Sequence, residues 1–187
     1  YDGAGPSCPG AVADQKGRKM DTRRRFEGKV GIPMPVVLVG NVMEGKANFM
    51  TAPGCTRVAY RPPMMAVGSN KRQFTAAGIT ANRTFSLCLA DSSMKDAVDY
   101  CGLASGRDTD KSGLFELFSG TVANAPMIAR CPVNMECSVE HEVELPFNYV
   151  FIARVINTYA RSDVLEHGSL APERIDPMVL TMPDNRY

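Results

Sequence analysis

The sequence predicts a β-rich protein, built mainly of antiparallel strands with a few helices and folded as a small closed or split β-barrel. Apolar, β-branched runs at 36–39 and 149–159 are typical of strands. Residues 133–140 alternate strictly between apolar and polar side chains, which indicates a half-buried strand. Sixteen glycines and thirteen prolines supply the many turns that such a fold needs, and 187 residues fit one domain.

The first half of the chain predicts three strands and a helix. Two strands form a hairpin around a turn at 43–46, and two prolines precede the third strand. Pro53-Gly54 interrupts the second strand, so we expect a loop through Arg61. The strands are expected at 36–39, 47–51 and 64–68, followed by a helix from 74 to about 83.

The second half alternates strands with short helices. Met94, Ala97, Val98 and Cys101 share one face of a helix that begins at Asp91 or Ser92, and this face is interpreted as core. Further strands are expected at 84–89, 133–140, 149–159 and 178–180, with a charged loop at 105–111 and a short apolar helix at 114–118. In the 133–140 strand the alternation places Cys137 on the buried face and Glu136, with its neighbouring glutamates, on a solvated face.

Charge and composition narrow the class of protein. A net charge of +1 argues against a nucleic-acid surface, and residues 1–29 are interpreted as a flexible N-terminal arm before a domain at 30–187. No apolar run has the roughly 20 residues that a membrane span needs, so a cytoplasmic protein without membrane contact is expected. The six cysteines show no CxxC spacing and the two histidines follow no ligand pattern, which favours free thiols and no metal site.

One stretch has the chemistry of a ligand site. The end of a strand, 48–51, lies near a polar segment, 69–75, that leads into the first helix. Strand backbone groups can bond the edge of a flat ring, while Arg72 and Thr75 at a helix N-terminus suit a phosphate, as in flavin mononucleotide (FMN). A solvated loop with ordinary turn and cap residues is the alternative for the same segment.

Catalytic motifs are absent from the sequence. It contains no GxGxxG, P-loop, HExxH or GxSxG pattern, and no acid–base pair is marked by spacing. A dinucleotide-binding Rossmann unit is therefore excluded, and no catalytic side chain is assigned. If the protein is an enzyme, a cofactor carries its chemistry.

Several segments resemble the flavoredoxin branch of the flavin reductase-like, FMN-binding split-barrel family. The similarity covers roughly residues 30–182, and the Tyr-Cys-Gly to Asp-Lys segment is its distinctive part. The segments that carry the resemblance are 33–40, 48–51, 99–111, 125–128 and 131–137.

The resemblance implies a six-stranded split β-barrel that forms a homodimer and binds FMN non-covalently near the subunit interface. The implied activity is that of an FMN-dependent oxidoreductase that takes electrons or hydride from NAD(P)H or a redox partner protein and passes them to a protein or flavin acceptor. A pure electron carrier, or a non-catalytic flavin or haem carrier on the same barrel, is the alternative.

The resemblance also implies the residues that hold FMN. Asn48, Met50, Thr51 and Ala52 line the ring, and Ser69, Arg72 and Thr75 hold the phosphate end. Lys111 reaches the ribityl phosphate or the pyrimidine edge of the ring, with an ordinary surface lysine as the alternative, and Ser105 is a further candidate. Cys55 is expected in a loop beside the flavin. We expect Cys55, together with Cys8 in the N-terminal arm, to react with thiol reagents, and FMN to slow the reaction at Cys55 but not at Cys8.

Overall fold

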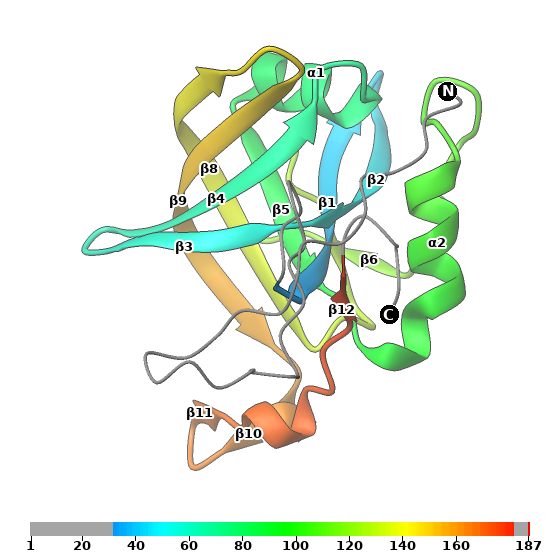
Figure 1. The fold of residues 1–187 in the computed structure, drawn as a ribbon. Helices are drawn as coiled ribbons and strands as arrows, with labels where there is room; N and C mark the ends of the chain where they lie inside the picture. The colour runs from blue at the N-terminus through cyan, green and yellow to red at the C-terminus, as the bar shows by residue number, and fades with distance from the viewer. Residues whose placement is uncertain (1–31, 182–186) are drawn as a thin grey trace, which may run out of the picture.

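The computed structural model describes residues 32–181 and 187 (Figure 1). The predicted N-terminal arm lies outside these residues. The long strands and the two helices are β1 (Met34–Met43), β2 (Lys46–Pro53), β3 (Cys55–Tyr60), β4 (Pro63–Asn70), α1 (Phe74–Asn82), β5 (Thr84–Leu89), α2 (Lys95–Leu103), β8 (Val133–Glu144) and β9 (Asn148–Ala160). The shorter elements are η1 (Ser92–Met94), β6 (Leu117–Phe118), β7 (Met127–Ile128), η2 (Ser162–Val164), β10 (Leu165–Glu166), β11 (Ser169–Leu170), η3 (Pro172–Arg174) and β12 (Val179–Leu180).

The large sheet is an antiparallel barrel that stays open along one seam. Its strands follow the order β12-β1-β5-β8-β9-β4-β3, and β2 pairs with β1 outside this path. β2 and β4 face each other across the seam without ladder hydrogen bonds. This arrangement confirms the predicted split barrel, with β3 as an additional edge strand.

Two apolar cores lie on opposite faces of β1, because alternate side chains of a strand point to opposite sides of the sheet. Val37 and Val39 face the barrel interior, where they meet Ile79 of α1. Val36 and Leu38 face outward and pack under α2. The barrel is therefore filled by one helix and covered by the other.

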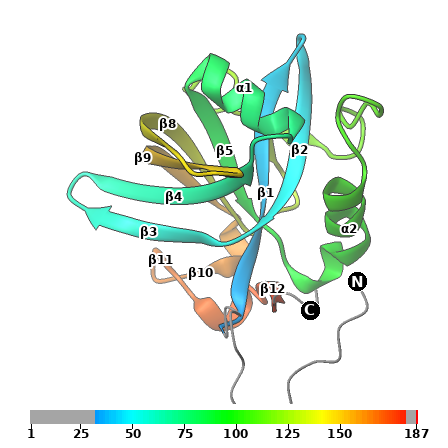
Figure 2. The same ribbon diagram turned by 45° about the horizontal axis from the view of Figure 1, so that its top comes forward.

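The two helices approach the same rim of the barrel. Figure 2 shows α1 lying across one end of the barrel and α2 standing beside β1 and β2. Gly78 brings α1 close to β1, since a Cβ at this position would lie 2.1 Å from the sulfur of Met43. The N-terminus of α1 and the C-terminus of α2 consequently flank the end of β2 that carries Asn48 and Met50.

Two predicted elements are wrong. The expected loop at 55–61 is strand β3, because Thr56, Val58 and Tyr60 favour an extended chain and β4 offers a free edge to pair with. β3 and β4 then project from the barrel as a hairpin (Figure 1). The expected helix at 114–118 does not form, because Leu117 and Phe118 pair with β7 and pack against the outer core.

Within the described residues, neither helix has the length and apolar character needed to cross a bilayer.

Candidate functional site

A polar cleft lies where the start of α1, the end of α2 and the 104–111 loop meet the rim of the barrel. It consists of two hollows of about 240 and 200 Å³ that share Phe74, Gly106 and Lys111. Each is smaller than the roughly 300 Å³ at which ligand pockets usually begin, so the two act as parts of one open site. Lining residues include Asn48 in one hollow and Met50, Arg72, Thr75 and Ser105 in the other.

The α1 end of the cleft favours an anion. Gln73, the N-cap residue of this nine-residue helix, makes no side-chain cap hydrogen bond, because its Oε1 accepts instead from Ser69 Oγ at 2.7 Å and Asn70 N at 3.1 Å. The first-turn N–H groups of α1 are therefore left without a side-chain cap, at the positive end of the helix dipole. Arg72 is exposed beside them, and within residues 32–181 no carboxylate pairs with it.

Arg107 adds a second cation to this end of the cleft. Its Nη1 donates to the backbone oxygen of Arg72 at 2.6 Å, and its guanidinium lies 5.4 Å from the ring centroid of Phe74. Ser105 shapes the loop that carries it, since Ser105 Oγ accepts from Arg107 N at 3.2 Å. The loop thus fixes a guanidinium against the residues that begin α1.

Lys111 is a buried cation at the centre of the cleft. Its residue is 3% exposed, and Nζ donates to the backbone oxygens of Phe49 at 3.0 Å and Cys101 at 3.1 Å. Burial lowers the pKa of Lys111, and among the described residues no carboxylate pairs with it. The ammonium has three donors and two carbonyl partners, so it retains capacity for an anionic or carbonyl ligand. An ordinary surface lysine, the alternative interpretation, is wrong.

Asn48 contributes a buried amide whose oxygen has no donor among the described residues. Its Nδ2 donates to Thr75 Oγ1 at 2.7 Å, whereas its Oδ1 has no hydrogen-bond partner among the described residues. Gly106 closes over this amide, since a Cβ at Gly106 would lie 2.1 Å from Asn48 Oδ1. A side chain at position 106 would fill the space, so only glycine allows the loop to approach the rim of the barrel here.

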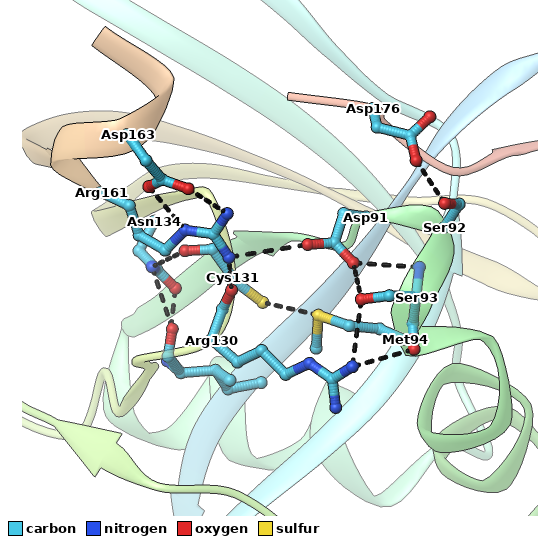
Figure 3. Close-up of polar contacts among 11 residues, drawn as sticks. Asp91, Ser92, Ser93, Met94, Arg130, Cys131, Asn134, Arg161, Asp163 and Asp176 are labelled. Atoms are coloured by element: carbon cyan, nitrogen blue, oxygen red, sulfur yellow. Dashed lines mark hydrogen bonds and ion pairs between the residues drawn. The ribbon is translucent and has the colours of Figure 1, made fainter. Parts of the chain in front are cut away.

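A polar network holds α2 in place at the far end from the cleft (Figure 3). Arg130 Nη2 donates to the backbone oxygen of Ser93 at 3.1 Å, and Arg161 Nη1 donates to the backbone oxygen of Arg130 at 2.7 Å. Asp91 caps η1 through Ser93 N and lies 3.7 Å from Arg161. Because these contacts tie the start of α2 to the loops after β7 and β9, the end of α2 is held at the cleft.

The remaining predicted site residues lie outside these two hollows. Thr51 Oγ1 donates to the backbone oxygen of Val98 at 2.5 Å and lines a separate hollow beside Leu103 and Gly102. Ala52 packs in the barrel interior, and Ser69 is buried behind Gln73, with its Oγ 3.6 Å from Met50 Sδ. The structure therefore gathers six of the nine predicted residues around the cleft, namely Asn48, Met50, Arg72, Thr75, Ser105 and Lys111.

Sequence reasoning missed several lining residues and misplaced others. Phe74, Gly106 and Arg107 were not singled out, although the Gly106-Arg107 pair lies in the charged loop that the resemblance marks. Glu136, expected on a solvated face, is fully buried. Cys55 lies in β3 and lines neither part of the cleft; burial against the barrel interior raises the pKa of its thiol.

The comparisons with known proteins agree with this geometry. The model of the "Flavin reductase like domain" family matches residues 29–181. Flavoredoxin from Methanosarcina acetivorans is 42% identical with a TM-score of 0.85, over 89% of this chain and 90% of its own. Flavoredoxin of Desulfovibrio vulgaris is 23% identical with a TM-score of 0.79, over 88% of this chain and 92% of its own, and shows the same fold. No curated protein sequence matches significantly.

The chain therefore belongs to the flavin reductase-like family. This confirms the predicted family and supports a flavin-binding redox protein.

Proposed function

We propose that this protein is an FMN-dependent oxidoreductase of the flavoredoxin and flavin reductase type, located in the cytoplasm. FMN, bound non-covalently in the cleft, supplies the capacity to accept electrons or hydride from NAD(P)H or a redox partner protein and to pass them to a protein or flavin acceptor. The structure of an "FMN-binding protein from Thermus thermophilus" is 24% identical with a TM-score of 0.69, and that of a Streptomyces globisporus NADH:FAD oxidoreductase is 22% identical with a TM-score of 0.63. These names support a flavin ligand for this chain. The visible spectrum and mass spectrometry described below distinguish FMN from FAD.

The charge pattern of the cleft is the observation that carries this proposal. Arg72 and Lys111 are cations without carboxylate partners among the described residues, and both line the same hollow of the cleft. A ligand with an anionic group would satisfy both cations, and FMN carries such a group in its phosphate.

In this proposal the protein's own groups bind the cofactor and adjust its redox properties, and they do not themselves react. Arg72 and the uncapped N–H groups of α1 hold the phosphate, with Thr75 oriented by Asn48. Lys111 presents positive charge inside the cleft, where burial weakens solvent screening, so it favours states of a bound ligand that carry more negative charge. No side chain is assigned as a nucleophile or as a proton donor.

A homodimer completes the site in this proposal. The two hollows are open, and Leu103, which lines one of them, is 89% exposed. The β3–β4 hairpin also presents Val58 and Tyr60 to solvent. A second copy that covers these apolar groups would enclose the cleft. Light scattering at micromolar concentration should give a dimer mass, and a monomer that still binds FMN would contradict the dimer.

A visible spectrum tests the flavin proposal. The purified protein, or the protein reconstituted with flavin, should show flavin absorption, and mass spectrometry of the released chromophore should identify FMN. Anaerobic bleaching by NADH or NADPH would support a reductase, whereas bleaching by dithionite alone would favour a carrier that takes electrons from a protein donor. A protein that binds neither FMN nor FAD after reconstitution would overturn the proposal.

A further inference from the structure

A hollow separate from the cleft lies beside the start of α2. Its volume is about 390 Å³, above the roughly 300 Å³ at which ligand pockets usually begin. It shares no lining residue with either part of the cleft, so a ligand here would not occupy the proposed flavin site. Its lining combines apolar side chains with two charged ones and includes Met94, Ala97, Phe115, Glu116, Ala129 and Arg130.

The apolar wall of this hollow is held in place by the outer core. The ring of Phe115 packs edge-on against the ring of Phe49 in β2, with 5.4 Å between the ring centroids. Met94 is buried in the same core, and its Sδ accepts a hydrogen bond from Cys131 Sγ at 3.8 Å. An apolar ligand group would therefore meet a preformed surface and would not have to order these side chains on binding.

Arg130 supplies a guanidinium that is fixed but only partly used. Its Nη2 donates to the backbone oxygen of Ser93 at 3.1 Å and to Ser93 Oγ at 3.0 Å (Figure 3). Ser93 Oγ in turn donates to the carboxylate of Asp91. These bonds use the two hydrogens of Nη2, whereas the N–H groups of Nη1 and Nε have no partner among the described residues. They are free to bind a carboxylate.

Glu116 adds the opposite charge to the same hollow. Its side chain is exposed, and its backbone oxygen accepts a hydrogen bond from Ala129 N at 2.9 Å, which places it beside the segment that carries Arg130. Within residues 32–181, Glu116 and Arg130 form no ion pair, either with each other or with another side chain. Two opposite charges that line one hollow without pairing match a ligand that carries both charges.

From these contacts we propose that the hollow beside α2 binds an α-amino acid with an apolar side chain. The carboxylate of the ligand meets the free N–H groups of Arg130, and its ammonium meets the carboxylate of Glu116. The apolar side chain of the ligand lies against Met94 and Phe115. The inference does not rest on the proposed flavin chemistry, because the hollow and the cleft have no lining residue in common.

Calorimetric titration of the full chain with three matched ligands tests the proposal. L-phenylalanine carries both charges, 3-phenylpropionate lacks the ammonium and 2-phenylethylamine lacks the carboxylate. L-phenylalanine should bind saturably, and each analogue should bind about tenfold more weakly because it loses one charge-assisted contact. Absence of saturable L-phenylalanine binding, or equal affinity for all three ligands, would overturn the inference.

Substitution of the two charged residues assigns each contact. Glu116→Gln should weaken L-phenylalanine about tenfold and leave 3-phenylpropionate unchanged, since that ligand has no ammonium to lose a partner. Arg130→Met should weaken L-phenylalanine to the same extent and leave 2-phenylethylamine unchanged. Glu173→Gln and Arg174→Met are the matched controls, because both residues are exposed on η3 and neither lines the hollow; they should change no affinity.

A third variant leaves both charges in place, which matters because Arg130 also holds Ser93 at the start of α2. Ala97→Phe puts a ring into the hollow and should abolish L-phenylalanine binding. FMN affinity should stay unchanged, since Ala97 lines neither part of the cleft. L-phenylalanine binding that survives Ala97→Phe would place the ligand elsewhere and overturn the inference. A wild-type protein that binds L-phenylalanine but no flavin would refute the proposed function and leave the hollow assigned.

Discussion

Two buried charged residues of this barrel, Glu136 and Lys111, differ in how fully their charged groups are hydrogen-bonded. Glu136 on β8 is fully buried, and its carboxylate accepts hydrogen bonds from Thr121, Val122, Asn157 and Tyr159. Lys111 is nearly as buried, but among the described residues its ammonium has only two backbone carbonyls as partners, and it lines two hollows.

We infer from this difference that Glu136 has a structural role, and we propose a ligand-binding role for Lys111. The donors around Glu136 belong to the 119–123 loop and to β9, so the carboxylate fastens that loop to the sheet, and it lines neither part of the cleft. The ammonium of Lys111 keeps capacity on the side of the cleft. Substitution of each residue tests whether its charge has only the role that its partners indicate.

Glu136→Ala should cause the largest loss of stability. The substitution leaves several buried donors without an acceptor, and we expect it to cost about 3 kcal/mol of unfolding free energy. FMN affinity should not change, because Glu136 lines neither part of the cleft. Urea denaturation measures the first effect and a fluorescence titration the second.

Glu140→Ala is the matched control for this stability prediction. Glu140 lies on the same strand and pairs with Arg154 at the surface, so its loss should cost less than about 0.5 kcal/mol. Equal losses of unfolding free energy in the two variants would refute the role of Glu136 in fastening the 119–123 loop to the sheet.

The pH dependence of stability provides a second test of Glu136. Hydrogen bonds to the carboxylate lower the pKa of Glu136 from 4.5 to about 2. Because the folded-state pKa lies below the unfolded value, the stabilisation is complete above pH 4.5 and is lost as the pH falls towards 2. Glu136→Gln should therefore lose less stability than the wild-type protein across this interval, and parallel curves would contradict the assignment.

Arg72→Ala should have the largest effect on cofactor binding. The phosphate would lose a charge-assisted contact of about 1.5–3 kcal/mol, which weakens FMN roughly tenfold to a hundredfold. The unfolding free energy should change little, because Arg72 is exposed. Arg174→Ala, which removes an exposed arginine from η3 outside the cleft, is the control. Unchanged FMN affinity in Arg72→Ala would remove this residue from the site.

Lys111→Met should alter the redox potential more than the stability. Loss of the buried positive charge should lower the potential of bound FMN by roughly 30 mV, equivalent to about 1.4 kcal/mol for two electrons. The lost hydrogen bonds to Phe49 and Cys101 are offset by removal of a poorly solvated ammonium, so the unfolding free energy should change by less than about 1 kcal/mol. Spectroscopic redox titration and urea denaturation measure the two effects, and a large loss of stability with an unchanged potential would make Lys111 structural.

The contrast between these two charges also shows what the sequence could predict. Alternation at 133–140 correctly predicted β8 and the buried position of Cys137. It could not show that the 119–123 loop covers the other face and buries Glu136, because that contact joins segments distant in the chain. In the same way, the charged loop placed Lys111 near the site, but its burial depends on where α2 ends and how closely Gly106 approaches β2. Local pattern predicted the strands, and long-range packing decided which charges became available to a ligand.

The smallest expected effect concerns the cysteines, which lie away from both charges. Cys55 is the one partly exposed thiol among the five described cysteines; the other four are buried. Burial raises the pKa of Cys55, so a thiol reagent should modify it slowly at neutral pH, and raising the pH should speed the reaction. Because Cys55 packs against the barrel interior and lines neither part of the cleft, FMN should leave its labelling rate unchanged, in contrast to the protection expected from the sequence. Mass spectrometry of native protein labelled with and without FMN measures both rates, with Cys55→Ser as the control that removes the signal. Strong protection by FMN would place the flavin nearer to β3 than Arg72 and Lys111 allow.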